Sequence, residues 1–195
     1  MFIVGLDLGQ KQDHSAIVVL EKPESHLPFL QPQDRFLTVR AAERIPLGTP
    51  YPEVVEMMRH VVNLPALQGQ RCALVVDATG VGRPVVDMLR AARLVWQVTA
   101  VTITGGDKQS YRAGESDSVN VPKQDLISGL LLALEKDELK IAKKVGEAGT
   151  LVRELLDVRM SSSESGRLSF GAEGRGQHDD LVCALAIAIW RARKR

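Results

Sequence analysis

Three aspartates lie at the edges of apolar segments that would form the core of a fold. Asp7 ends the apolar run 2–6, Asp77 ends the run 74–76, and Asp180 opens the apolar run that follows it. Carboxylates held together repel one another, and without a cation their pKa values would rise. Sites made only of oxygen ligands favour Mg²⁺ or Mn²⁺. The sequence therefore predicts a divalent-cation site built from these three acids.

Each acid also has a simpler structural interpretation. Asp7 and Asp77 could cap the turns that follow their segments, because aspartate is common in turns. Asp179 and Asp180 fall in the first turn of a predicted helix, where the helix dipole favours negative side chains. That helix is apolar on all sides, so an acid facing the core needs a metal or another cation as its partner. Asp180 is the first choice for the third ligand and Asp179 the second. The adjacent His178 either ligates the metal and helps to activate water or is an ordinary exposed residue.

The predicted elements would carry these acids on one sheet. Apolar runs predict strands at about 2–8, 15–20 and 35–45, and their order favours antiparallel pairing. Strands at 72–76 and 95–103 flank a helix at about 84–93, which makes a βαβ unit with a parallel pair. The remaining predictions are helices at 51–63, 122–136, 146–158 and 178–193, a loop at 104–120, and short strands at 139–142 and 167–170. The expected fold is α/β, with a mixed five-stranded central sheet, three antiparallel strands then parallel strands, flanked by helices.

Composition and charge limit the class of protein. A chain of 195 residues with 45% hydrophobic content can bury one sizeable core, so we expect a single domain over 1–195. The 25 basic and 24 acidic residues nearly cancel, so any nucleic-acid contact must depend on local charge. No apolar run reaches the roughly 18 residues of a membrane span, and the N-terminus lacks a signal-peptide pattern. Cys72 and Cys183 lie in apolar contexts and are interpreted as small buried hydrophobes, which fits the reducing cytoplasm.

Three motifs, taken in order, resemble those of the RNase H-like (retroviral integrase) nucleases. They are residues 5–9 with 13–16 after them, residues 76–82, and residues 178–180 at the start of an alanine-rich helix. Within that superfamily, the chain resembles the nuclease domain of bacteriophage terminase large subunits. The resemblance implies an RNase H-like nuclease domain that hydrolyses DNA phosphodiester bonds and cuts concatemeric viral DNA during genome packaging.

The resemblance also implies a two-metal mechanism with two Mg²⁺ or Mn²⁺ ions. Two such ions stabilise the attacking and leaving oxygens of a phosphodiester. Asp7 would bridge the two ions, and Asp77 and Asp180 would hold one ion each. Asp13, in the turn after the first strand, either tunes the site by hydrogen bonding to its ligands or is a simple turn residue.

Double-stranded DNA is the implied substrate, and its backbone needs cations beside the site. The candidates are Lys108, Arg112, Lys123 and Arg175, each of which could equally be an ordinary solvated loop charge. The chain has no Gly-x-x-x-x-Gly-Lys-[Ser/Thr] phosphate loop, so no ATPase domain and no motor activity are expected of it. The implied partners are a terminase ATPase domain, the small terminase subunit and the portal, in the cytoplasm of the host cell.

The sequence leaves two alternatives open and excludes a third by its length. A RuvC-like Holliday junction resolvase would share the acids and act on branched DNA. A non-catalytic RNase H-like binding domain would keep the fold without using the acids. Actin- or hexokinase-like phosphotransferases also begin with a strand that ends in Asp-x-Gly, but they need two lobes to enclose ATP, and 195 residues are too few.

Overall fold

The protein folds around one eight-stranded mixed sheet. The computed structural model describes residues 1–9, 13–23, 36–80, 82–95, 97–162, 168–171 and 179–194. The strand order is β6-β7-β5-β4-β1-β2-β3-β8. The strands are β1 (Phe2–Asp7), β2 (Ala16–Glu21), β3 (Leu37–Arg44), β4 (Cys72–Asp77), β5 (Gln97–Thr104), β6 (Ser110–Arg112), β7 (Glu115–Pro122) and β8 (Leu139–Ile141).

The predicted centre of this sheet is confirmed. Strands β1, β2 and β3 pair antiparallel, and β1, β4 and β5 pair parallel. The prediction of five strands is wrong, because β7, β6 and β8 extend the sheet at its two edges. The stretch 104–120, predicted as a loop, contains β6 and most of β7. Its exposed polar residues obscured the strand, because the buried apolar side chains of β7 all lie in its second half, at Val119, Val121 and Pro122.

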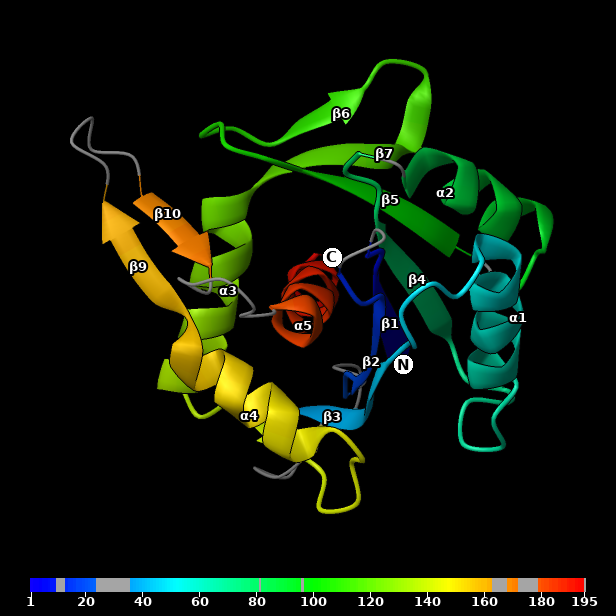
Figure 1. The fold of residues 1–195 in the computed structure, drawn as a ribbon, viewed down its shortest axis with the longest axis horizontal. Helices are drawn as coiled ribbons and strands as arrows, with labels where there is room; N and C mark the ends of the chain where they lie inside the picture. The colour runs from blue at the N-terminus through cyan, green and yellow to red at the C-terminus, as the bar shows by residue number, and fades with distance from the viewer. Residues whose placement is uncertain are drawn as a thin grey trace, which may run out of the picture.

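Five helices cover the two faces of the sheet (Figure 1). Helices α1 (Tyr51–Val62) and α2 (Gly82–Ala91) lie on one face, and α3 (Lys123–Glu135), α4 (Ala148–Asp157) and α5 (Asp180–Arg193) lie on the other. A hairpin of β9 (Arg159–Ser162) and β10 (Leu168–Gly171) lies beside α3. Among the described helices, none is long and apolar enough to cross a membrane.

The two faces of β1 belong to two separate hydrophobic clusters. Val4 and Leu6 pack with α1 and α2, whereas Ile3 packs with α5. This alternation places Gly5 and Asp7 on the α5 face as well, because successive strand residues point to opposite faces. At Gly5 the helix comes very close, since a Cβ there would lie 2.1 Å from the carbonyl oxygen of Ala184. The sheet therefore holds the carboxylate of β1 directly beside α5.

Candidate active site

The sheet brings Asp7 and Asp77 together. Strands β1 and β4 are parallel neighbours whose register pairs Leu6 with Val76, so the two aspartates follow at the same carboxyl edge. Both lie on the α5 face by the strand alternation, and their carboxyl groups hydrogen-bond to each other. In open α/β sheets this edge is where ligands bind.

Helix α5 adds two more acids to the same place. It begins at Asp180, which is 5% exposed, and Asp179 precedes it as the N-cap residue. Burial raises the pKa of Asp7 well above its ordinary value, and the charges of Asp77, Asp180 and Asp179 raise it further, in that order. Because such effects require proximity, the structure gathers the other three predicted acids around Asp7.

The turn after β4 fixes the Asp77 side chain. The backbone N–H of Thr79 donates to Asp77 Oδ1 at 2.7 Å, and Thr79 Oγ1 accepts from the N–H of Ile103 at 2.9 Å. Burial raises the pKa of Asp77, while the hydrogen bonds from Thr79 and Asp7 and the charge of Lys123 offset part of that rise. Gly82 closes the turn tightly, since a Cβ there would lie 2.6 Å from the carbonyl oxygen of Asp77.

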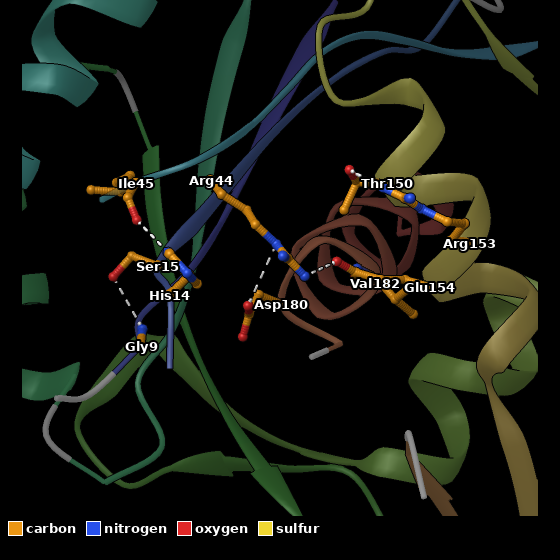
Figure 2. A network of polar contacts seen from close by, with 10 residues as sticks. All are labelled: Gly9, His14, Ser15, Arg44, Ile45, Thr150, Arg153, Glu154, Asp180 and Val182. Carbon is orange, nitrogen blue, oxygen red and sulfur yellow. Dashed lines mark hydrogen bonds and ion pairs between the residues drawn. The ribbon is translucent and has the colours of Figure 1, made fainter. Parts of the chain in front are cut away.

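Two cations from outside α5 balance its acids. Lys123 Nζ lies 3.8 Å from Asp179 Oδ2, and Arg44 Nε lies 3.7 Å from Asp180 Oδ2. Arg44 also binds Glu154, a buried acid on α4, with 2.5 Å between Nη2 and Oε1 (Figure 2). Lys123 was expected as a DNA contact, and the structure places it beside the acids.

The acids have the donor chemistry of a hard divalent cation, but their side chains are held by other partners. Within the described ranges, no three acidic, histidine or cysteine side chains are arranged to chelate an ion. Asp7 and Asp77 bind each other, and ion pairs join Asp179 to Lys123 and Asp180 to Arg44. The donor set itself, four aspartates gathered at one sheet edge, suits Mg²⁺ or Mn²⁺.

Several predicted site residues do not join the cluster. Asp13 is exposed and lines a separate hollow of about 270 Å³ with Gly9 and Thr49. Lys108 is exposed in the turn before β6, and the exposed Arg112 lies 3.8 Å from Glu115. His178 and Arg175 fall outside the described residues.

A second hollow, of about 600 Å³, lies at the other end of the sheet. Its lining includes Met1, Cys72 and Gln97, which begin or precede β1, β4 and β5. The acids stand at the opposite, carboxyl ends of β1 and β4, so this hollow is separate from the candidate site.

The two cysteines form no disulfide and are half-buried rather than fully buried. The pKa of the Cys183 thiol is raised well above its ordinary value by burial and then by the charges of Asp7 and Asp179. Cys183 therefore lies close to the acids, which its apolar sequence context did not predict.

Sequence reasoning missed Arg44 and Glu154. Arg44 is the last residue of β3 and Glu154 lies in α4, yet they meet Asp180 and the first turn of α5. The only local signal is that Glu154 follows the buried Leu151 by three positions, which puts an acid on the inward face of an amphipathic helix.

The fold is RNase H-like, and solved terminase nuclease domains share it over nearly the whole chain. No protein-family model matches the sequence, and no curated protein has a significantly similar sequence. The large terminase nuclease of the thermophilic phage G20c, solved with bound magnesium, has a TM-score of 0.66 and 23% identity over 98% of this chain and 81% of that chain. It has also been solved with bound cobalt.

More distant structures share the fold too. The large terminase nuclease domain of bacteriophage SPP1, with bound manganese, has a TM-score of 0.57 and 13% identity over 97% of this chain and 85% of that chain. The nuclease domain of the human cytomegalovirus terminase, soaked in manganese, has a TM-score of 0.61 and 8% identity over 98% of this chain and 84% of that chain.

Proposed function

We propose that this protein is a divalent-metal-dependent DNA endonuclease that acts as the nuclease part of a large terminase during viral genome packaging. One observation carries the proposal: the parallel register of β1 and β4 brings Asp7 and Asp77 to the carboxyl edge of the sheet, and the start of α5 adds Asp180 and Asp179 there, all three of which raise the pKa of Asp7. Such a cluster of acids, with Asp180 buried and the other three half-buried, is costly without a cation. Its occurrence in a fold shared with metal-bound terminase nucleases supports this function over a purely structural role.

The proposed ligands are Asp7, Asp77 and Asp180, with Asp179 beside them. Asp7 interacts with each of the other three, so it is the residue best placed to be shared between two ions. Bound Mg²⁺ or Mn²⁺ would supply a lowered pKa for the attacking water and charge stabilisation for the leaving oxygen. The chain itself contributes the carboxylates: Thr79 orients Asp77 through its backbone N–H, and β1 places the half-buried Asp7 beside α5.

Lys123 is the proposed contact to the DNA backbone nearest the acids. It begins α3 and pairs with Asp179, so its ammonium group stands where a phosphate would approach the carboxylates. With a net charge of only +1, binding of double-stranded DNA by this chain alone should be weak, salt-sensitive and largely independent of sequence. We propose that an ATPase domain, the small terminase subunit and the portal bring the DNA to it in the host cytoplasm.

Nicking of supercoiled plasmid with and without Mn²⁺ or Mg²⁺ tests the proposal. Wild-type protein should nick only with metal, and Asp7→Asn and Asp77→Asn should lose the activity because the amide is a poorer metal ligand and carries no charge. Asp87→Asn is a suitable control, because Asp87 is an exposed acid on α2, on the opposite face of the sheet. Far-UV circular dichroism should show the same fold in all variants.

Three results would count against the proposal. Undiminished nicking by Asp7→Asn would show that the acids do not form the reaction centre. A wild-type protein that neither binds metal nor cuts DNA would favour the non-catalytic binding domain. Preference for four-way junctions over linear duplex would favour the junction resolvase instead.

A further inference from the structure

Among the described residues at the start of α5, no side chain caps the helix. Asp179 occupies the N-cap position, where an aspartate usually accepts a hydrogen bond from an N–H two or three residues later, but its side chain makes no such bond. The N–H of Val182 donates instead to Glu154 Oε2 at 3.0 Å. Glu154 belongs to α4, so a neighbouring helix supplies the missing cap.

The other oxygen of Glu154 is also occupied. Glu154 Oε1 accepts from Arg44 Nη2 at 2.5 Å, and the Nε of the same guanidinium lies 3.7 Å from Asp180 Oδ2. Figure 2 shows the guanidinium between the two carboxylates, with the start of α5 beside them. Glu154 and Asp180 are buried, at 6% and 5% exposed, and Arg44 between them is half-buried. The three charges come from three different elements, α4, α5 and β3.

We propose that Glu154 and Arg44 are positioning residues that hold the first turn of α5, and with it Asp180, in place for metal binding. This inference rests on the proposed function. Glu154 fixes the backbone of that turn through Val182, and Arg44 holds the Asp180 side chain while being held by Glu154. Partners that lie behind metal ligands and fix their orientation in this way commonly determine metal affinity.

This arrangement explains why Glu154 of α4, rather than the N-cap residue Asp179, accepts the hydrogen bond from the first turn of α5. If Asp179 capped Val182, its carboxylate would turn toward the helix and away from the other acids. With Glu154 as the cap, the Asp179 carboxylate lies instead beside Lys123 and contributes to the field around Asp7. The structure thus keeps both acids at the start of α5 on the side of the cluster.

Isothermal titration calorimetry with Mn²⁺ on the full chain tests the inference. Glu154→Ala should weaken Mn²⁺ binding by roughly 10-fold to 100-fold, the usual effect of losing a residue that orients a metal ligand. Glu154→Gln keeps an oxygen for the Val182 N–H but no charge for Arg44, so its affinity should fall between those of wild type and Glu154→Ala. Asp157→Ala is the matched control, because Asp157 is an exposed acid one turn further along α4, and wild-type affinity is expected.

Circular dichroism below the melting temperature ensures that only folded protein is compared. A purely structural role for Glu154 would lower the melting temperature but leave the Mn²⁺ affinity of the folded protein unchanged, and that result would overturn the inference. If Glu154→Ala does not fold, the test uses Glu154→Gln only. A wild-type Mn²⁺ affinity of Glu154→Gln would then overturn the inference. Failure of the wild-type protein to bind Mn²⁺ would refute the proposed function itself. The failure of the proposed function is thus distinguishable from the failure of the positioning inference.

Discussion

Replacing Gly5 by alanine should separate Asp7 from Asp180 without touching either residue. An added Cβ would lie 2.1 Å from the carbonyl oxygen of Ala184 and 3.2 Å from Cβ of Ala188. Real Cβ atoms essentially never approach a heavy atom more closely than 3.0 Å. The first neighbour is helix backbone, which cannot rotate away as a side chain would. Helix α5 must therefore move off β1 by about 1 Å.

That displacement has a cost in stability and a cost at the site. Forcing one extra methyl group into a packed interior typically costs about 1–3 kcal/mol of unfolding free energy. For a chain of this size each kcal/mol lowers the melting temperature by roughly 2–4 °C. Because α5 carries Asp180 and β1 carries Asp7, the same movement pulls the acids apart. A misplacement of about 1 Å can reduce the rate of an enzyme by roughly 100-fold.

Urea unfolding, Mn²⁺ calorimetry and plasmid nicking together measure this prediction. Gly129→Ala is the control, because nothing lies within 4 Å of the place that a Cβ would take at this position of α3. There alanine should stabilise the protein by about 0.5–1 kcal/mol, since glycine is a poor residue inside a helix. The reasoning is refuted if Gly5→Ala unfolds at the wild-type urea concentration and nicks DNA at the wild-type rate.

Three further predictions concern charge at the site. Asp7→Asn should raise the melting temperature of the metal-free protein, because it removes a carboxylate whose charge is disfavoured by burial and by Asp77, Asp180 and Asp179. It should also abolish the stabilisation by Mn²⁺, which for wild type is about 2.7 kcal/mol of unfolding free energy at a Mn²⁺ concentration of 100 times the dissociation constant. Melting curves with and without Mn²⁺ would contradict this if both proteins shifted equally. Since the pKa of Asp7 is raised, its contribution to metal-free stability is full below the unfolded pKa of about 3.9 and is lost as pH rises through the folded pKa. Mn²⁺ affinity should increase as the pH rises over the same interval, because Asp7 loses its proton there. Calorimetry that finds the same affinity at every pH would contradict this prediction. Lys123→Met should weaken DNA binding at every sequence and reduce the slope of log affinity against log salt concentration by about 1. Fluorescence anisotropy at several salt concentrations measures this slope. An unchanged slope would show that Lys123 does not contact the DNA.

The central strands were predictable because their sequences are dominated by burial. Strands β1 and β4 are short apolar runs that end in aspartate, and a strand buried on both faces reads as a continuous hydrophobic segment. The edge strands carry no such pattern. All three residues of β6 are exposed, and β7 begins with the polar residues 115–118. Pairing of β7 with β5, and of β6 with β7, therefore decides their conformation rather than side-chain burial.

The meeting of Asp7 and Asp77 was predictable because both end buried strands, whereas the contacts of Arg44 and Glu154 were not. Asp7 and Asp77 end strands whose pairing follows from the βαβ order, so their meeting could be inferred. Arg44 and Glu154 are 110 positions apart in the sequence and meet only because β3 and α4 flank the same helix. No periodicity in either segment specifies that contact, since it depends on how α4 packs against α5.

The structure also bears on the choice between Asp179 and Asp180 as the third ligand. Asp180 is buried, contributes more to the raised pKa of Asp7 than Asp179 does, and lies beside a guanidinium that Glu154 holds in place. The half-buried Asp179 pairs with Lys123, whose long side chain can follow a DNA phosphate instead. A buried ligand with a fixed cation loses little freedom when a metal binds, whereas the pair of Asp179 and Lys123 can exchange partners when substrate arrives. We therefore propose Asp180 as the third ligand and Asp179 as the acid that responds to DNA.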